Sequence, residues 1–312
     1  MAADEFADGL AAALFPDDLV SPEWLAAHLD KPGLQVVDMR GYVKTEDLGG
    51  GRQKGVYLGA RDEYEAAHIP GATYVDWTSD IVDPDAEVKA QIAPPMVFAR
   101  RMESVGVGDD TSVVVVDHAG GHLATRLWWA LRYYGHENVA ILDGGYQVWQ
   151  ELNLPLTSEP TTPPEVAVAF TPRPVRKLIS DRDDVLAAVL SGDRQVLDAR
   201  ITAQYSGEVQ RGTRGGHIPG AVNLPAQSLV RRDGRWMTRE EIRLEVHAAG
   251  IDLDQPVTAY CNGGVTATQL LFGLHRAGAT DISNYDGSWN EWGERLELPV
   301  EGNRDLFANE AE

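Results

Sequence analysis

Four segments in the first half of the chain recur in the same order in the second half, and this repeat constrains the fold more than any other feature. The first copy reads LQVVDMR, AHIPGATYVDW, SVVVVDHAGG and AILDGGYQVW. The second copy reads RQVLDAR, GHIPGAVNLP, VTAYCNGGVT and SNYDGSWNEW. The spacing from Asp117 to Asp143 matches the spacing from Cys261 to Asp286 within one residue. A tandem duplication explains this order, so the chain should fold as two similar units.

A stretch rich in proline and threonine separates the two copies. The segment LTSEPTTPPEVAVAFTPRP at 156–174 favours an extended linker over a packed element. We therefore predict an N-terminal domain at 10–155, a linker at 156–176 and a C-terminal domain at 177–303. A chain of 312 residues, 43% of them hydrophobic, is long and apolar enough to fill two cores.

The first copy is longer than the second between its DMR and HIPGA segments. The extra length falls in the glycine-rich sequence LGGGRQKGVYLG, at 48–59. Because connecting segments usually run over the surface, we expect a solvent-facing loop there. A flexible lid over a cleft between the domains is the alternative.

Short β-branched runs alternate with longer helical patterns, which indicates the fold class. Four runs are apolar on both sides, as buried parallel strands are: 113–116, 139–142, 195–198 and 257–260. Apolar residues recur at helical spacing from Ala267 to Leu274, and Gly278 ends the pattern, which predicts a helix over about 266–277. This alternation predicts α/β domains, each with a mainly parallel sheet flanked by helices.

The charge balance argues against two classes of partner. The chain has 27 Lys and Arg against 48 Asp and Glu, for a net charge of −21. Such an acidic chain should bind neither nucleic-acid phosphates nor an anionic membrane. It also has no run of about 18 apolar residues and no basic stretch at its start, so neither a membrane span nor a secretory signal is expected. A single cysteine cannot form an internal disulfide, and together these features predict a cytoplasmic protein.

The one cysteine, Cys261, lies between a strand pattern and a helix pattern. Reactive residues of such sheets lie in the loops at the carboxyl ends of strands. Gly263 and Gly264 allow the following turn to point several main-chain N–H groups at one centre, near the positive end of a helix dipole. This setting should favour the thiolate, which is the nucleophilic form of cysteine.

The alternative is that Cys261 is a small buried apolar residue, as most free cysteines are. Two observations argue against it. The corresponding residue of the first copy is Asp117, so the core does not require a thiol at this place. The glycines that follow Cys261 add no packing of their own. We therefore predict that Cys261 is catalytic.

In their order, these motifs resemble the rhodanese-type sulfurtransferases, specifically the tandem two-domain members that include thiosulfate and 3-mercaptopyruvate sulfurtransferases. The resemblance covers nearly the whole chain. It rests on both HIPGA segments, DAR at 198–200, CNGGVT at 261–266, RLWW at 126–129, LDGG at 142–145 and YDGSWNEW at 285–292. It implies two tandem rhodanese-like domains, the first catalytically silent because Asp117 replaces the cysteine.

The resemblance also implies a sulfur relay through Cys261. The thiolate would take the outer sulfur of a small-molecule donor, and cyanide or a thiol would then remove it from the cysteine persulfide. The cellular acceptor would be a small thiol or a thioredoxin-like protein. No metal or organic cofactor is implied. The persulfide anion would be held by the main chain of Asn262, Gly263, Gly264, Val265 and Thr266. The Thr266 hydroxyl could instead cap the helix.

The residues that would choose the donor depart from the family pattern. Thiosulfate-type members place a cation directly after the cysteine, where this chain has Asn262. Mercaptopyruvate-type members commonly have a serine at the position of Gly263. Both types tend to have an arginine where this chain has Gln204. The small, uncharged loop favours 3-mercaptopyruvate over thiosulfate.

Two arginines and one histidine are further candidates for substrate binding. Arg211 and Arg214 lie just before the second HIPGA segment and could bind the carboxylate or sulfonate of the donor, or pair with surface acids. His68 matches a histidine that faces the interdomain cleft in mercaptopyruvate-type relatives. Because His68 and His217 share one sequence setting, a structural role in the turn is the alternative for both.

Two other functions are considered. Cysteine phosphatases also place a cysteine between a strand and a helix, but they need an arginine six positions later, where this chain has Ala267. A non-catalytic sulfur carrier or partner-binding protein on the same scaffold is the second alternative, because fold alone does not fix function.

Overall fold

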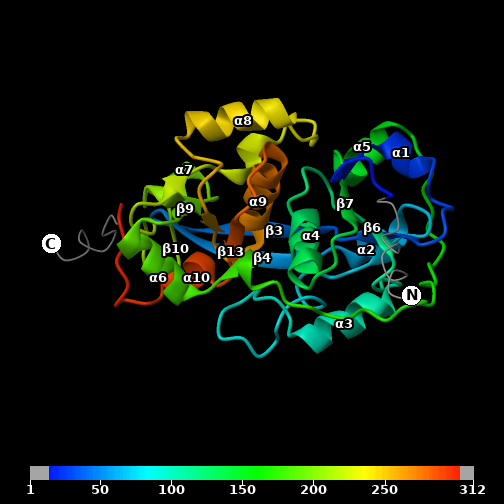
Figure 1. Ribbon diagram of the computed structural model, residues 1–312, viewed down its shortest axis with the longest axis horizontal. Coiled ribbons are helices and arrows are strands. Elements are labelled where there is room, and N and C mark those ends of the chain that lie inside the picture. The colour runs from blue at the N-terminus through cyan, green and yellow to red at the C-terminus, as the bar shows by residue number, and fades with distance from the viewer. Residues whose placement is uncertain (1–13, 303–312) are drawn as a thin grey trace, which may run out of the picture.

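The computed structural model describes residues 14–302, which form two domains built on similar five-stranded sheets (Figure 1). The first sheet has the order β1-β7-β6-β2-β5 and the second has the order β11-β9-β12-β13-β8. All strand pairs within both sheets are parallel. The predicted repeat and the predicted fold class are thus confirmed.

The strands of the two sheets match the predicted apolar runs. The first sheet contains β1 (Leu19–Val20), β2 (Leu34–Asp38), β5 (Thr73–Tyr74), β6 (Ser112–Val116) and β7 (Val139–Leu142). The second contains β8 (Ile179–Ser180), β9 (Gln195–Asp198), β11 (Val222–Asn223), β12 (Val257–Tyr260) and β13 (Ile282–Tyr285). The long strands are buried along their length, because helices cover both faces of a parallel sheet.

Helices follow the strands in both domains. The first domain contains α1 (Pro22–Ala26), α2 (Arg61–Ala66), α3 (Pro95–Ser104), α4 (Ala124–Tyr133) and α5 (Gly145–Glu151). The second contains α6 (Arg182–Ser191), α7 (Thr202–Tyr205), α8 (Arg239–Ala248), α9 (Val265–Ala277) and α10 (Ser288–Trp292), with 3₁₀ turns η1 (Arg176–Leu178) and η2 (Ala226–Leu229). No helix within residues 14–302 is long and apolar enough to cross a membrane.

Helices α4 and α9 join the two domains through a shared apolar core. Trp128 of α4 and Phe272 of α9 are almost fully buried and meet edge to face, with ring centroids 4.9 Å apart. Residues of both domains belong to one hydrophobic cluster that continues through this contact. Because α4 follows Asp117 and α9 follows Cys261, the packing of these helices brings the two equivalent loops together.

The linker is extended, and it is anchored to the first domain. Between α5 and η1 it contains no helix or long strand. The buried ring of Phe170 lies 5.7 Å from the ring of Phe98, and the main-chain N–H of Arg173 donates to the carbonyl of Tyr134. Such contacts hold the linker along the surface of the first domain.

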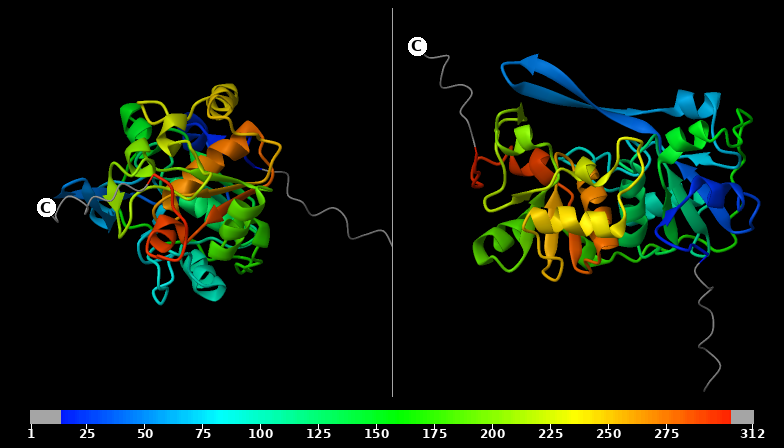
Figure 2. Two further views of the ribbon diagram at one scale, coloured as in Figure 1. Left: turned by 90° about the vertical axis from the view of Figure 1, so that its left-hand side faces the viewer. Right: turned by 90° about the horizontal axis from the view of Figure 1, so that it is seen from above.

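Residues 48–59 face solvent as expected, but the expectation of a loop is wrong. These residues form most of a long antiparallel hairpin of β3 (Gly41–Gly49) and β4 (Arg52–Gly59). The hairpin extends from the first domain along the second, as the right-hand view of Figure 2 shows. There β4 pairs in parallel with β10 (Gln210–Arg211), and the N–H of Gln210 donates to the carbonyl of Gly51 at 2.8 Å. The extra segment of the first domain is therefore part of a sheet that bridges both domains.

Candidate active site

Cys261 directly follows β12, and α9 begins four residues later at Val265. Gly264 has a φ of +73°, in the left-handed region, and allows the chain to turn from the strand into the helix. The predicted strand, loop and helix around the cysteine are present. We call residues 261–266 the cysteine loop.

Ser288, which the sequence analysis did not single out, bonds two main-chain amides of the cysteine loop. The Oγ of Ser288 accepts the N–H of Cys261 at 3.1 Å and the N–H of Gly264 at 2.9 Å, and its hydroxyl donates to the carbonyl of Tyr285. Ser288 has a φ of +52°, which is strained for a residue with a side chain. The amide of Gly264 is therefore turned toward Ser288 and helps to shape the turn, while the predicted part of this loop in holding a persulfide stays a prediction.

Four other amides of the cysteine loop stay available to an anion. Within residues 14–302, no hydrogen bond engages the N–H groups of Asn262, Gly263, Val265 or Thr266. Those of Val265 and Thr266 begin α9, where the helix dipole adds to their positive character. The loop therefore still offers an anion-binding set of amides next to Cys261.

A buried network fixes the other side of the loop. The carbonyl of Gly264 accepts from Arg126 at 3.2 Å and from Asn284 at 3.1 Å. Arg126 also forms a buried ion pair with Asp286 at 2.6 Å, and the second oxygen of Asp286 accepts the N–H of Ile92 at 2.7 Å. Arg126 and Ile92 belong to the first domain, so both domains determine the shape of the loop.

In the first domain, the equivalent loop contains an anion in place of the thiol. The carboxylate of Asp117 accepts the N–H groups of Gly121, Leu123 and Ala124 at 3.3, 2.8 and 3.1 Å. One main-chain hydrogen bond is shared by the two loops: the carbonyl of Asp117 accepts from Tyr146, as that of Cys261 accepts from Trp289. A loop of this design therefore holds a negative charge at the position that Cys261 occupies.

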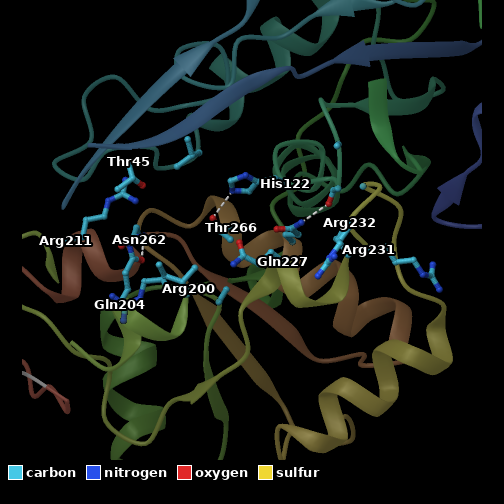
Figure 3. A pocket seen from close by; sticks show the side chains of 18 of the residues that line it. Thr45, His122, Arg200, Gln204, Arg211, Gln227, Arg231, Arg232, Asn262 and Thr266 are labelled. Carbon is cyan, nitrogen blue, oxygen red and sulfur yellow. Dashed lines mark hydrogen bonds between the residues drawn. The ribbon is translucent and has the colours of Figure 1, made fainter. Parts of the chain in front are cut away.

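A cavity of about 610 Å³ lies between the domains and is lined by the cysteine loop (Figure 3). We call it the interdomain cavity. Its walls come from the hairpin (Val43, Thr45, Gln53), the first-domain loop (Ala119, Gly120, His122) and the cysteine loop (Asn262, Thr266). Cys261 itself is only 2% exposed and packs in the hydrophobic cluster, so Asn262 and Thr266, and not the thiol, line the cavity.

Among the predicted site residues, Gln204, Arg211, Asn262 and Thr266 line the interdomain cavity. Asn262 donates from its side-chain amide to Gln204 at 3.0 Å, and Gln204 donates to Gln53 of the hairpin at 3.2 Å. A chain of amide side chains thus connects the hairpin with the residue next to the cysteine.

Two of the four residues predicted to bind the substrate do not line this cavity. Arg214 donates to the carbonyls of Trp292, Gly293, Arg295 and Leu298, and so closes the end of α10. His68 is 1% exposed, stacks on Tyr64, and bonds through its ring nitrogens to the carbonyl of Tyr64 and the hydroxyl of Thr161. His217 stacks in the same way on Tyr205. These contacts support the structural alternative for both histidines, whereas Arg214 bonds main-chain carbonyls, a role that the sequence did not suggest.

His122 is a second residue that the sequence analysis did not single out. Its Nε2 lies 2.9 Å from the hydroxyl of Thr266, across the domain interface (Figure 3). Loss of hydration lowers the pKa of His122 to about 4, so its ring is neutral at neutral pH. The Thr266 hydroxyl therefore bonds a side chain of the other domain, and α9 has no side-chain cap.

The sequence contains a signal for Ser288 but only a weak one for His122. Ser288 stands in YDGS, where the first copy has LDGG, so the repeat itself marks the exchange of a glycine for a hydroxyl. His122 belongs to the first-domain loop, whose neighbours in space come from the other copy. Only the packing of the domains reveals its contact.

The charge of Asp117 should make the protein less stable as the pH rises. Burial raises the pKa of Asp117 from 3.8 to about 6, although the three amides oppose the shift. Between these values the folded chain binds more protons than the unfolded chain. The free energy of unfolding therefore falls as the pH rises from about 4 to about 6, by up to about 3 kcal/mol in total. The measurement is the free energy of unfolding against pH for the wild type and for Asp117→Asn. A constant difference between the two curves from pH 4 to 7 would contradict the prediction.

Replacing Ser288 should disturb the cysteine loop more than the fold. Ser288→Gly loses three hydrogen bonds worth about 1 kcal/mol each but relieves about 1 kcal/mol or more of backbone strain, so stability should fall by about 2 kcal/mol. Ser288→Ala loses the same bonds and keeps the strain, so it should be less stable than Ser288→Gly. Denaturant unfolding compares the two variants, and equal stabilities would refute the strain. Both should slow the reaction at Cys261 by about tenfold or more, because the loop is no longer held in place.

Comparisons with known proteins agree with this architecture. The family model described as "Rhodanese-like domain" matches residues 21–152 and 181–295. A solved structure of SseA from Escherichia coli, described as a 3-mercaptopyruvate sulfotransferase, aligns with a TM-score of 0.76 and 33% identity over 87% of this chain and 98% of that chain.

Curated relatives match over most of both chains. The 3-mercaptopyruvate sulfurtransferase of E. coli K12 is 36% identical over 90% of this chain and 97% of its own length. The thiosulfate sulfurtransferase of Cricetulus griseus is 35% identical over 88% and 91%. The sulfur carrier protein TtuD of Thermus thermophilus is 33% identical over 91% and 96%. The chain therefore belongs to the rhodanese-like family and carries two copies of its domain in tandem.

Proposed function

We propose that this protein is a sulfurtransferase that carries a sulfur atom on Cys261 as a persulfide. The observation that supports it most directly is the pair of equivalent loops. In one, three amides hold the buried Asp117 carboxylate. In the other, the cysteine replaces that carboxylate and four loop amides have no partner within residues 14–302. An anion on the sulfur of Cys261, and then on the outer sulfur of the persulfide, would be stabilised in the same manner.

The transfer consists of two displacements at sulfur. The Cys261 thiolate attacks the sulfur of the donor, so a sulfur–sulfur bond forms while the carbon–sulfur bond of 3-mercaptopyruvate breaks. The electron pair of that bond stays on carbon, which takes the proton of the donor thiol to give pyruvate. A thiol or cyanide then attacks the outer sulfur, and the electron pair of the sulfur–sulfur bond returns to Cys261.

Arg211 is the residue we propose for binding the donor's carboxylate. It lines the interdomain cavity, is 9% exposed, and has no carboxylate partner within the described residues. A buried guanidinium without a counter-ion is unfavourable, so an anionic ligand next to it would be stabilised. Three other arginines line the cavity: Arg200 is paired with Asp198, Arg231 is paired with Glu241, and Arg232 is exposed to solvent, whereas Arg211 is buried beside the cysteine loop.

We propose that a donor with one negative charge suits the part of the cavity next to Arg211 and Asn262. Beside Arg211 the cavity offers the neutral amides of Gln53, Gln204 and Asn262. A carboxylate on Arg211 and a keto oxygen within reach of amide donors describe 3-mercaptopyruvate, whereas thiosulfate carries two charges. We therefore propose 3-mercaptopyruvate as the preferred donor, although relatives with either name match this chain to a similar degree.

The acceptor and the compartment are also proposed. Cys261 is the one cysteine of the chain, so the sulfur must leave to an external thiol, either a small thiol or a thioredoxin-like protein. A working free thiol suits a reducing compartment, and we propose the cytoplasm. The domain limits of 10–155 and 177–303 also stay a proposal.

A sulfur carrier is the second candidate function. The relative named a sulfur carrier is almost as similar as the sulfurtransferases, and the 2% exposure of Cys261 restricts a small donor's access. The phosphatase alternative has no structural support, since Ala267 is buried in α9 and the next arginine, Arg276, bonds Asp17.

One experiment distinguishes these functions. The purified protein is incubated with 3-mercaptopyruvate or with thiosulfate, and intact mass and thiocyanate formation from cyanide are measured. We expect a gain of one sulfur on Cys261, faster with 3-mercaptopyruvate, and no gain in Cys261→Ser. Loading from a persulfide-bearing protein but from neither small donor would identify a carrier instead.

Arg211→Ala should impair the donor step alone. The loss of one charge-assisted hydrogen bond costs about 1.5–3 kcal/mol, so the KM for 3-mercaptopyruvate should rise about tenfold to a hundredfold. Discharge of a preformed persulfide by cyanide should keep its rate. Arg100→Ala, which removes an exposed arginine on α3, is the matched control. Equal donor kinetics in both variants would remove Arg211 from the site.

A further inference from the structure

We infer that the β3–β4 hairpin of the first domain completes the donor-binding site of the second domain, by fixing Arg211 in the position that receives the donor's carboxylate. This inference rests on the proposed function and names the element that determines donor binding. The hairpin residues that carry it are Gln53, Gly55 and Tyr57. None of them belongs to the domain that contains the cysteine.

The guanidinium of Arg211 lies directly against the main chain of Gly55. A Cβ atom added at Gly55 would stand 1.3 Å from an Nη of Arg211 and 2.3 Å from its Cζ. Gly55 does not have a left-handed φ, so its backbone does not itself require a glycine. The missing side chain at residue 55 is therefore explained by the space that Arg211 occupies.

Tyr57 holds the same guanidinium from a second direction. An Nη of Arg211 donates to the Tyr57 hydroxyl at 3.3 Å, and its Cζ lies 5.7 Å from the centre of the ring. The Tyr57 hydroxyl also lies 3.3 Å from the place where a Cβ of Gly263 would be, so it borders the cysteine loop. Tyr57 thus fixes Arg211 beside the residues that follow Cys261.

The hairpin and the segment that carries Arg211 are joined by main-chain pairing. Arg211 lies in β10, opposite Gln53 of β4. Gln53 also accepts from Gln204, whose side chain accepts from Asn262. Figure 3 shows Arg211 next to Thr45 of the hairpin, with Asn262 and Gln204 on the same side of the pocket. The hairpin therefore contacts both the cation and the amide side chains that face the donor.

We predict that Gly55→Ala weakens donor binding with little effect on stability. The new methyl group meets the far end of a flexible side chain, so Arg211 should move aside at little cost to stability. Donor binding should then weaken as in Arg211→Ala, by about tenfold or more, because the cation no longer reaches the carboxylate. The two substitutions should not add, since the double variant has no guanidinium left to displace.

The first experiment measures binding without chemistry. Pyruvate and 3-mercaptopyruvate are titrated calorimetrically into Cys261→Ser protein carrying Gly55→Ala, Arg211→Ala, both changes, or the control Leu48→Ala at an exposed hairpin position. We expect dissociation constants raised about tenfold or more in both single variants, the same value in the double variant as in Arg211→Ala, and no change with Leu48→Ala. An unchanged affinity in Gly55→Ala, or effects that multiply in the double variant, would overturn the inference.

Tyr57→Phe provides a second variant that adds no bulk. It removes one hydrogen bond to Arg211, so the KM for 3-mercaptopyruvate should rise several-fold while cyanide discharge stays constant, and the effect should vanish in an Arg211→Ala background. A Tyr57 effect that persists without Arg211 would contradict the positioning role. Failure of the wild type to gain sulfur would refute the proposed function, whereas the binding results decide on the hairpin separately.

Discussion

The buried contact of Arg126 with the cysteine loop is the interaction on which the site depends. From α4 of the first domain, its guanidinium reaches the carbonyl of Gly264 and the carboxylate of Asp286 in the second domain, and the carbonyl of Ala90 in its own. Arg126 and Asp286 are 1% and 5% exposed, so each charge requires the other. The geometry around Cys261 is consequently a property of the assembled pair of domains.

The two copies of the loop both place main-chain amides next to one side chain, which is a carboxylate in the first copy and a thiol in the second. In the first domain the carboxylate of Asp117 accepts hydrogen bonds from three loop amides. The second domain keeps the amides and replaces the carboxylate with a thiol, whose charge can appear, move to an added sulfur and leave. The glycine at 145 and the serine at 288 show that the surrounding residues diverged with the loops, because only the second copy has a hydroxyl that engages two loop amides.

The sequence predicted the elements whose cause is local or repeated, and it missed contacts made between the copies. Apolar runs and glycines placed β12, the cysteine loop and α9 correctly, because burial and turn geometry are set within a few residues. The hairpin was misjudged because its glycines and polar residues are typical of a loop, and its pairing partner Gln210 is distant in sequence. Arg211 and Arg214 are three positions apart, but only the fold shows that one faces the cavity and the other closes a helix.

The hairpin gives the first domain, which has Asp117 in place of the cysteine, a direct part in the site of the second. A second domain cut away from the first would keep its nucleophile, yet it would have neither Gly55 and Tyr57 beside Arg211 nor Arg126 beneath Gly264. Its thiol would be present without the means to select a substrate. On the proposed function, the two domains therefore form one working unit, in which each supplies parts that the other lacks.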